Sequence, residues 1–268
     1  MNPSKPKILI TGAAGRIGRV LSEALAQDYS LRLFDKAPIQ HGGEAESIVA
    51  DLSDAAALER AMHGVDQLIH LAAIPGEAPF EELLEPNILG TYAVFEAARK
   101  AGVKRILYAS SIQAVGFHRL QGGVTQDSRI RPSGYYGVAK AVGEALGSLY
   151  ADKFGISVAC LRIASFEAQP ADHRHLSTWF SHADCVRLFR ACIEAPHFSF
   201  VTVYGVSANQ HSVVHDSVPA AIDYRPQDNA EPFRAALDHP DAAPTATTLF
   251  AGGEFCGRGF VGDFDRVR

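Results

Sequence analysis

The sequence predicts an α/β fold, in which a doubly wound parallel sheet carries helices on both faces and a small appendage follows at the C-terminal end. Short apolar runs alternate with amphipathic stretches through the first two-thirds of the chain. A glycine-rich loop directly follows the first apolar run, and the second apolar run ends in a carboxylate, Asp35. Regular alternation of strand and helix signals is typical of parallel sheets, because each crossover between parallel strands passes through a helix.

The elements follow from the period of the apolar residues. We expect strands at 7–11, 31–35, 47–50, 66–71, 104–110, 157–163 and 200–204. We expect helices near 16–28, 54–63, 80–101, 134–154 and 181–195. From about residue 219 the chain is rich in Pro, Asp and Gly and has weaker periodicity. This last stretch is expected either to wrap the domain or to form a subunit contact.

The glycine loop contains Gly12, Gly15 and Gly18, with Arg16 and Ile17 between the last two glycines. It is a G-x-x-G-x-x-G variant of the Rossmann loop. Glycines at these positions allow a tight turn, a close approach of the backbone to a pyrophosphate, and close packing of the next helix, whose N-terminus supplies free N–H donors. A plain strand-to-helix turn gives the same pattern, so the loop needs support from the residues that follow.

Asp35 supplies that support, because a carboxylate at the end of the second strand accepts hydrogen bonds from an adenosine ribose. It would repel a 2′-phosphate, so NAD is favoured over NADP. Lys36 and Arg16 would reach a phosphate if they turned inward, but they can equally be solvated surface charges. Asp51 either caps the next helix or accepts from the adenine amino group, and the sequence leaves both open.

Tyr136 and Lys140 lie four residues apart, so on a helix they share one face. For tyrosine to act as a base near neutral pH, its pKa of about 10 must fall by roughly three units, or about 4 kcal/mol, and a nearby cation supplies part of this. The pair follows a dinucleotide loop and a strand that ends in Ser110 and Ser111. This order indicates a dehydrogenase active site.

Composition excludes several classes of partner. The formal net charge of -5 leaves no basic stripe for nucleic acid and no polybasic patch for a membrane. The first strand begins too early for a signal peptide, and no apolar run approaches the roughly 18 residues of a membrane span. Cys160, Cys185, Cys192 and Cys256 lack metal-ligand spacing, which favours free thiols in a reducing cytoplasm and predicts no catalytic metal.

These residues resemble the extended short-chain dehydrogenase/reductases of the NAD-dependent epimerase/dehydratase family. The counterparts are the glycine loop, Asp51-Leu52, 70–73, Asn87, Ser111 and Tyr136/Lys140. Within that family the chain is most similar to uronate dehydrogenases, NAD enzymes that oxidise C1 of galacturonate or glucuronate to a lactone. The segments that carry this narrower similarity are 79–81, 110–111, 176–181, 205–209 and 228–231.

The resemblance implies roles for individual residues. Tyr136 would accept the anomeric hydroxyl proton as hydride leaves C1, Lys140 would hold the nicotinamide ribose and depress the tyrosine pKa, and Ser111, rather than Ser110, would hydrogen-bond the reacting oxygen. The cofactor contacts would come from Gly12, Gly15, Arg16, Ile17, Gly18, Asp35, Lys36, Asp51, Leu52, Leu71, Ala72, Ala73, Asn87, Tyr136, Lys140 and Ile163.

On the substrate side, Ser165 matches a substrate-contacting serine, and Arg174 matches the arginine that grips the C6 carboxylate as a planar fork. A surface ion pair is the alternative for Arg174. The chain departs from the uronate enzymes at Ile112-Gln113, where they carry Asn-His, and at Pro75, where they tend to carry serine. Near 210–216 it also lacks their Trp-Trp pair. The resemblance therefore implies the reaction of the uronate dehydrogenases more strongly than their substrate specificity.

Three alternatives stay open. His173 and His175 beside Arg174 are either ordinary loop histidines or extra donors suited to a sulfonate, as in sulfoquinovose. A nucleotide-sugar epimerase or dehydratase shares the cofactor loop, but usually has a longer C-terminal region. A non-catalytic NAD(P) sensor would often lack the tyrosine or the lysine.

We therefore expect one domain over 1–268, with an NAD-binding core at 1–163, and with mainly substrate-binding loops, a closing helix and a C-terminal extension at 164–268. The expected function is oxidation of a small sugar acid at C1 with NAD. The resemblance also implies a homo-oligomer.

Overall fold

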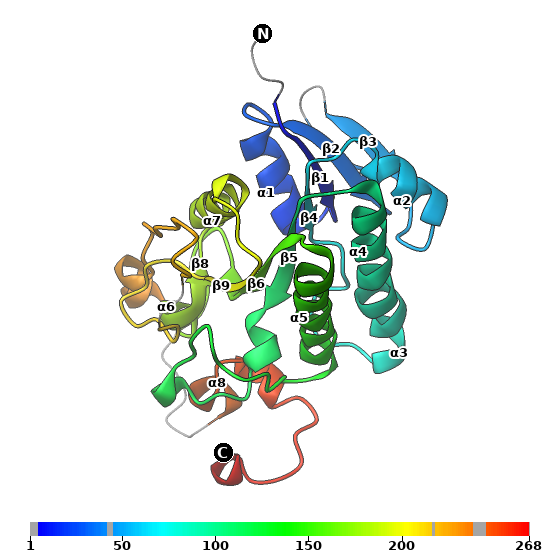
Figure 1. The fold of residues 1–268 in the computed structure, drawn as a ribbon. Coiled ribbons are helices and arrows are strands. Elements are labelled where there is room, and N and C mark those ends of the chain that lie inside the picture. The colour runs from blue at the N-terminus through cyan, green and yellow to red at the C-terminus, as the bar shows by residue number, and fades with distance from the viewer. Residues whose placement is uncertain (1–4, 42–44, 216–217, 238–244, 268) are drawn as a thin grey trace.

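Seven strands form one parallel sheet in the order β3-β2-β1-β4-β5-β6-β9 (Figure 1). The computed structural model describes residues 5–41, 45–215, 218–237 and 245–267. The strands are β1 (Lys7–Thr11), β2 (Ser30–Asp35), β3 (Glu46–Val49), β4 (Gln67–His70), β5 (Arg105–Ser111), β6 (Ser157–Ile163) and β9 (Phe200–Gly205). The strand order reverses between β1 and β4, and ligands bind beyond the carboxyl ends of the strands at such a switch point. The predicted doubly wound fold is confirmed.

Helices cover both faces of the sheet, as Figure 1 shows. One face carries α1 (Arg16–Leu25) and α7 (His182–Glu194), and the other carries α2 (Ala55–Met62), α4 (Gly90–Ala101) and α5 (Tyr135–Phe154). Successive side chains of a strand point to opposite faces. In β1, Ile8 and Ile10 accordingly pack with Leu21 of α1, whereas Leu9 packs with Phe95 of α4.

The single helix expected over 80–101 is divided into three parts. These are α3 (Phe80–Leu83), a π-helix over Leu84–Leu89, and α4. Pro86 lies in the middle part, and proline cannot donate the hydrogen bond that a regular α-helix requires. The interruption brings Asn87 under the loop that follows β4.

The carboxyl end of the sheet is covered by small elements that periodicity did not predict. A two-stranded sheet consists of β7 (Ser165–Phe166) and β8 (Trp179–Phe180), with α6 (His175–Thr178) before β8. The C-terminal part contains α8 (Ala246–Leu249). Among the described residues, 3₁₀ turns lie after β5 at Ile112–Val115 and Leu120–Gly122, and in the C-terminal part at Glu231–Ala236, Gly253–Cys256 and Phe264–Arg266. The N–H groups of Ala251 and Gly252 donate to the carbonyls of His118 and Gly116, so this part closes on the loop after β5.

Among the residues with described structure, no helix has the length and apolar character that crossing a membrane requires.

Candidate active site

The glycine loop is packed so tightly that side chains are excluded. A Cβ added to Gly12, whose φ is +77°, would lie 2.6 Å from the backbone nitrogen of Ala72 in the loop after β4. A Cβ on Gly18 would lie 2.3 Å from the carbonyl oxygen of Gly12. Helix α1 begins here after Gly15, which has no side chain with which to cap its first N–H groups. These features fit a bound pyrophosphate, because its oxygens accept from such N–H groups.

Asp35 joins the loops that follow β1 and β2. Its two carboxylate oxygens accept from the N–H groups of Ala14 and Ala37, both at 2.9 Å. A cavity of about 1050 Å³ opens beside it, lined by the glycine loop, Asp35, Lys36, 50–53 and 71–74, and it continues between α2 and α4. The residues at its glycine-loop end suit the adenosine half of a dinucleotide. Lys36 is exposed.

Asp51 does not cap helix α2, because Asp54 does so by accepting from the N–H of Ala57 at 2.9 Å. Asp51 instead accepts from the backbone and hydroxyl of Ser53, and these bonds lower the pKa of its carboxyl. Leu52 follows as a buried residue of the same cavity. The helix-cap alternative is thus wrong, and Asp51 lies on the wall of the cavity beside Asp35.

The Asn87 side chain holds the loop over residues 71–74 by two hydrogen bonds. Its Oδ1 accepts from the N–H of Ile74 at 2.7 Å, and its Nδ2 donates to the Ile74 carbonyl at 3.0 Å. The side chain is buried and both ends of its amide are thereby used. Leu71, Ala72 and Ala73 are left at the cavity wall, beside Gly12.

Buried His70 joins β1 to the start of α4. The Thr91 hydroxyl donates to the Asn87 carbonyl, so it can only accept from His70 Nε2, at 3.2 Å. His70 Nδ1 then accepts from the Thr11 hydroxyl at 2.7 Å. Burial, assisted by the charge of Lys140, lowers the pKa of His70 to about 3. The ring is therefore neutral at physiological pH.

Ser111, Tyr136 and Lys140 meet at the carboxyl end of β5. Lys140 Nζ donates to the Ala109 carbonyl at 2.8 Å and lies 5.5 Å from the centre of the Tyr136 ring and 5.2 Å from that of Tyr108. Burial lowers the pKa of Lys140 to about 8. Burial raises the pKa of Tyr136 to about 12, and a hydrogen bond with Ser111 opposes part of that rise. The sequence led us to expect a lowered pKa for Tyr136, whereas in the structure burial raises this pKa.

Glu77 is a site residue that the sequence did not reveal. Helix α5 begins after Gly134, which has no side chain with which to cap it. The Glu77 carboxylate accepts instead from the N–H groups of Tyr135 at 2.7 Å and Tyr136 at 3.1 Å. A carboxylate at a helix N-terminus is favourable, and here it fixes the turn that carries Tyr136. Nothing in the spacing connects residue 77 to residue 135.

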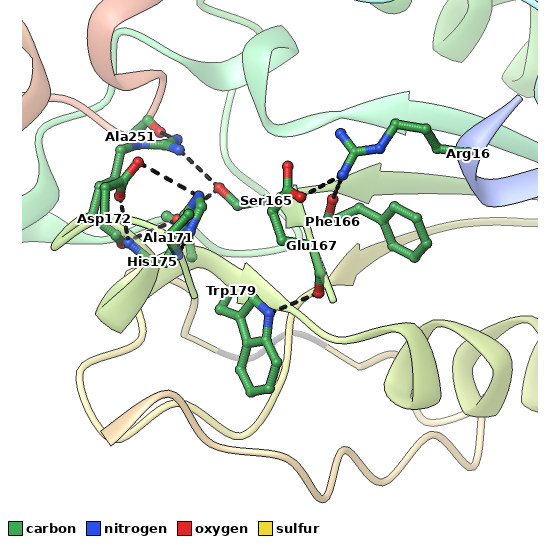
Figure 2. A network of polar contacts seen from close by, with 11 residues as sticks. Arg16, Ser165, Phe166, Glu167, Ala171, Asp172, His175, Trp179 and Ala251 are labelled. Carbon is green, nitrogen blue, oxygen red and sulfur yellow. Dashed lines mark hydrogen bonds and ion pairs between the residues drawn. The ribbon is translucent and has the colours of Figure 1, made fainter. Parts of the chain in front are cut away.

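Arg174 is the cation of the substrate side. Its Nη1 donates to the Ser165 hydroxyl at 2.9 Å, and its Nη2 donates to the Ala251 carbonyl at 2.6 Å (Figure 2 shows Ser165 and Ala251). Its Nε is buried and has no hydrogen-bond partner. Burial lowers the pKa of Arg174, and within the described ranges no carboxylate forms an ion pair with it. The surface-ion-pair alternative is therefore wrong.

Two of the residues that differ from the uronate pattern, Ile112 and Gln113, contact the 251–252 segment that Arg174 also holds. Ile112 is buried in an apolar cluster with Ala251, and Pro75 is exposed. The Gln113 amide is used internally, since Oε1 accepts from Ser133 at 2.6 Å and Nε2 donates to the Gly252 carbonyl at 3.2 Å.

The two histidines beside Arg174 differ in their surroundings. His175 is buried and its Nδ1 accepts from the N–H of Ala171 at 2.9 Å, whereas His173 is half-buried. His175 therefore serves the local turn, and this removes one of the extra donors on which the sulfonate alternative depended.

Arg16 connects the glycine loop to the substrate side. It reaches from the first turn of α1 to the Phe166 carbonyl at 2.9 Å and to the Glu167 carboxylate at 2.5 Å, as Figure 2 shows. Arg16 is thus engaged by the segment after β6 in this structure, while Ile17 packs against the core. Ile163 ends β6 opposite Ser111.

Residues 8–184 match the NAD dependent epimerase/dehydratase family. The chain is 41% identical over 254 residues to uronate dehydrogenase of Agrobacterium fabrum, covering 93% of this chain and 96% of that protein. It is 36% identical over 249 residues to NAD-dependent glucose-6-phosphate dehydrogenase of Haloferax volcanii, covering 84% and 95%.

The fold also matches solved structures. A mutant of uronate dehydrogenase from Agrobacterium tumefaciens complexed with NAD superposes with a TM-score of 0.89 at 40% identity, over 94% of this chain and 97% of that chain. Sequence, fold and cofactor cradle agree, and they remove the non-catalytic alternative. The chain belongs to the NAD dependent epimerase/dehydratase family and is an NAD-dependent sugar dehydrogenase.

Proposed function

We propose that the protein oxidises C1 of a hexopyranose that carries an anion at C6, of hexuronate type, to the corresponding lactone. The observation that carries this proposal is the half-buried Arg174 guanidinium, which has no ion pair among the residues of known placement and a buried, unpartnered Nε. The carboxylates of Asp172 and Glu254 influence it without an ion-pair contact. A desolvated cation that lacks a directly paired anion is costly, so an anionic ligand is its natural partner.

Arg174 is connected to the reacting end of the site. Its Nη2 holds the Ala251 carbonyl, and the next residue, Gly252, accepts from Gln113 two positions after Ser111. A sugar that spans the two ends would meet Arg174 at C6 and Ser111 and Tyr136 at C1. Residues 1–163 would bind NAD in this arrangement, and 164–268 would supply mainly substrate contacts.

The cofactor contacts are proposed from the geometry described above. Gly12, Gly15 and Gly18 would let the pyrophosphate approach the backbone, the N–H groups of Arg16 and Ile17 at the start of α1 would hold it, and Asp35 would accept from the adenosine ribose. Lys36, Asp51 and Leu52 lie around the adenosine end, Leu71–Ala73 line the centre, and Lys140 and Ile163 lie at the nicotinamide end. Bound NAD supplies the hydride acceptor.

The protein's own residues would then move one proton. Tyr136 accepts it from the C1 hydroxyl, Ser111 orients the reacting oxygen, and Lys140 stabilises the tyrosinate that begins to form. C1 of a pyranose is a hemiacetal carbon, so the oxidation requires neither water nor a covalent intermediate.

The class of substrate is supported by a property that two of the relatives share, although a third relative, 34% identical over 252 residues, is an L-arabinose 1-dehydrogenase. A uronate carries a carboxylate on C6, and glucose 6-phosphate carries a phosphate there. Both names therefore describe hexoses with an anion at the same end.

The test compares Arg174→Met and Arg174→Lys with the wild type on glucuronate, galacturonate, sulfoquinovose and glucose. Loss of charge-assisted hydrogen bonds costs roughly 3 kcal/mol, so we expect Arg174→Met to raise KM for the anionic sugar about a hundredfold. Arg174→Lys keeps the charge but not the fork, and should recover part of that loss. Equal effects on the anionic sugars and on glucose would contradict the proposed role, and a preference for sulfoquinovose would reassign the anion to a sulfonate.

A further inference from the structure

A buried ion pair lies directly behind the proposed catalytic residues. Arg162 Nε donates to Glu144 Oε1 at 2.9 Å, and Nη2 donates to Oε2 at 2.8 Å. Each side chain is only 5% exposed. The attraction within a buried pair often fails to exceed the cost of removing both charges from water, so stability alone is a weak reason for this one.

The Glu144 carboxylate joins the elements that carry the site. On α5 it lies four residues after Lys140 and eight after Tyr136, so the three side chains share one side of the helix. Glu144 Oε1 also accepts from the Ser110 hydroxyl on β5 at 2.6 Å. Ser110 lies opposite Arg162 in the β5–β6 register, one position before the Ser111–Ile163 pair.

Arg162 is itself fixed from the far side. Its Nη1 donates to the Tyr204 hydroxyl of β9 at 3.1 Å, and that hydroxyl donates to the Thr125 carbonyl at 3.0 Å. The guanidinium therefore cannot follow the carboxylate if α5 shifts along the sheet.

The hydrogen bond to Glu144 also explains why Ser110 and Ser111 have different roles. An ionised carboxylate only accepts hydrogen bonds, so the Ser110 proton is committed to Glu144. Ser110 cannot donate to a substrate while that bond exists. Ser111 is one residue further along β5, and its hydroxyl forms a hydrogen bond with Tyr136.

We propose that Glu144 is a positioning residue for the sugar oxidation, held in place by Arg162. It fixes α5 against the end of β5, so that Tyr136 and Lys140 keep their separation from Ser111. The inference rests on the proposed function, because it requires those three residues to perform the reaction. Small displacements of reacting groups cost large factors in rate, so the network acts on kcat.

The first experiment uses Ser110→Ala, which removes the Ser110–Glu144 bond and leaves the ion pair intact. We expect kcat to fall between about tenfold and a hundredfold, while KM for NAD stays near the wild-type value. Ser22→Ala is the matched control, because Ser22 is buried on α1 and its hydroxyl has no partner. A kcat for Ser110→Ala within twofold of wild type would overturn the proposal.

The second experiment separates positioning from folding. Glu144→Gln leaves the guanidinium without its counter-charge, so stability and kcat should both fall. The double variant Glu144→Leu with Arg162→Met removes both charges and should recover the unfolding temperature, but its kcat should stay low because Ser110 has lost its acceptor. Recovery of kcat together with stability would show that the pair serves the fold alone.

Tyr136→Phe is measured beside these variants. If it is inactive while Ser110→Ala is unaffected, the positioning role fails and the proposed function survives. If Tyr136→Phe retains full activity, the proposed function fails, and this inference fails with it.

Discussion

The Lys140 ammonium lies 5.5 Å from the centre of the Tyr136 ring, and its hydrogen bond to the Ala109 carbonyl holds it there. The two groups are close enough to influence each other, yet burial opposes ionisation of both. It raises the pKa of Tyr136 to about 12 and lowers that of Lys140 to about 8. In the free protein Tyr136 is therefore protonated at neutral pH, so we expect kcat/KM for the sugar to increase as the pH rises from 6 to about 8, above which Lys140 loses the charge that stabilises the tyrosinate.

Replacing Tyr136 by Phe tests the proposed base. Acid–base catalysis by a positioned side chain contributes roughly 10²–10⁴-fold, so kcat should fall by that factor while the affinity for NAD stays near wild type. The measurements are initial rates of NADH formation and a calorimetric titration with NAD. Tyr135→Phe is the control, since Tyr135 is 55% exposed. Retained activity in Tyr136→Phe would exclude the tyrosine from the chemistry.

Replacing Asp35 by Asn tests cofactor choice. The substitution removes the charge that would repel a 2′-phosphate and one of the two acceptors that hold Ala14 and Ala37. We expect KM for NAD to rise about tenfold, and the preference for NAD over NADP to fall by at least that factor. Steady-state kinetics with both cofactors check this, with the exposed Glu23→Gln on α1 as control. An unchanged preference would show that Asp35 does not select the cofactor.

Replacing Glu77 by Ala tests the cap of α5. Two helix N–H groups lose their acceptor, so the free energy of unfolding should fall by about 1 kcal/mol. The first turn carries Tyr136, so kcat should fall as well, and more than KM for NAD rises. Urea unfolding and initial rates measure the two effects, and Glu23→Ala on α1 provides the comparison. Lower stability with an unchanged kcat would limit Glu77 to a structural role.

His70 predicts a dependence of stability on pH. Its folded pKa is about 3 and its unfolded pKa is about 6.5, so between these values only the unfolded chain binds the proton. Stability should therefore fall as the pH drops below 6.5, by about 1.4 kcal/mol from His70 alone between pH 7.5 and 5.5.

His70→Gln should lack that increment. The measurement is the free energy of unfolding in urea at both pH values, for the variant and the wild type. Equal pH dependence in the two proteins would mean that His70 is protonated in the folded state.

The parts of the site that local rules govern could be predicted from the sequence. Tyr136 and Lys140 share a helix face because they lie four residues apart, and the glycine loop requires glycine because Gly12 touches Ala72. The strand ends followed from apolar runs, and Pro86 in the expected helix over 80–101 was a visible signal for the break.

The rest depends on contacts between residues that are far apart in the chain. Glu77 reaches Tyr136, and Gln113 reaches Gly252, with nothing in the spacing to indicate either pair. The pKa of Tyr136 also could not be predicted, because motif spacing contains no information about burial. The expected drop considered only the neighbouring cation.

The most direct test of the central claim is the initial rate of NADH formation at 340 nm with pure protein, NAD, and glucuronate, galacturonate, sulfoquinovose, glucose and a UDP-hexose in turn. The proposed function predicts turnover of hexoses with an anion at C6, with a uronate the best substrate and glucose poor. Turnover of the UDP-hexose alone, or of glucose as well as any uronate, would contradict a site built around Arg174.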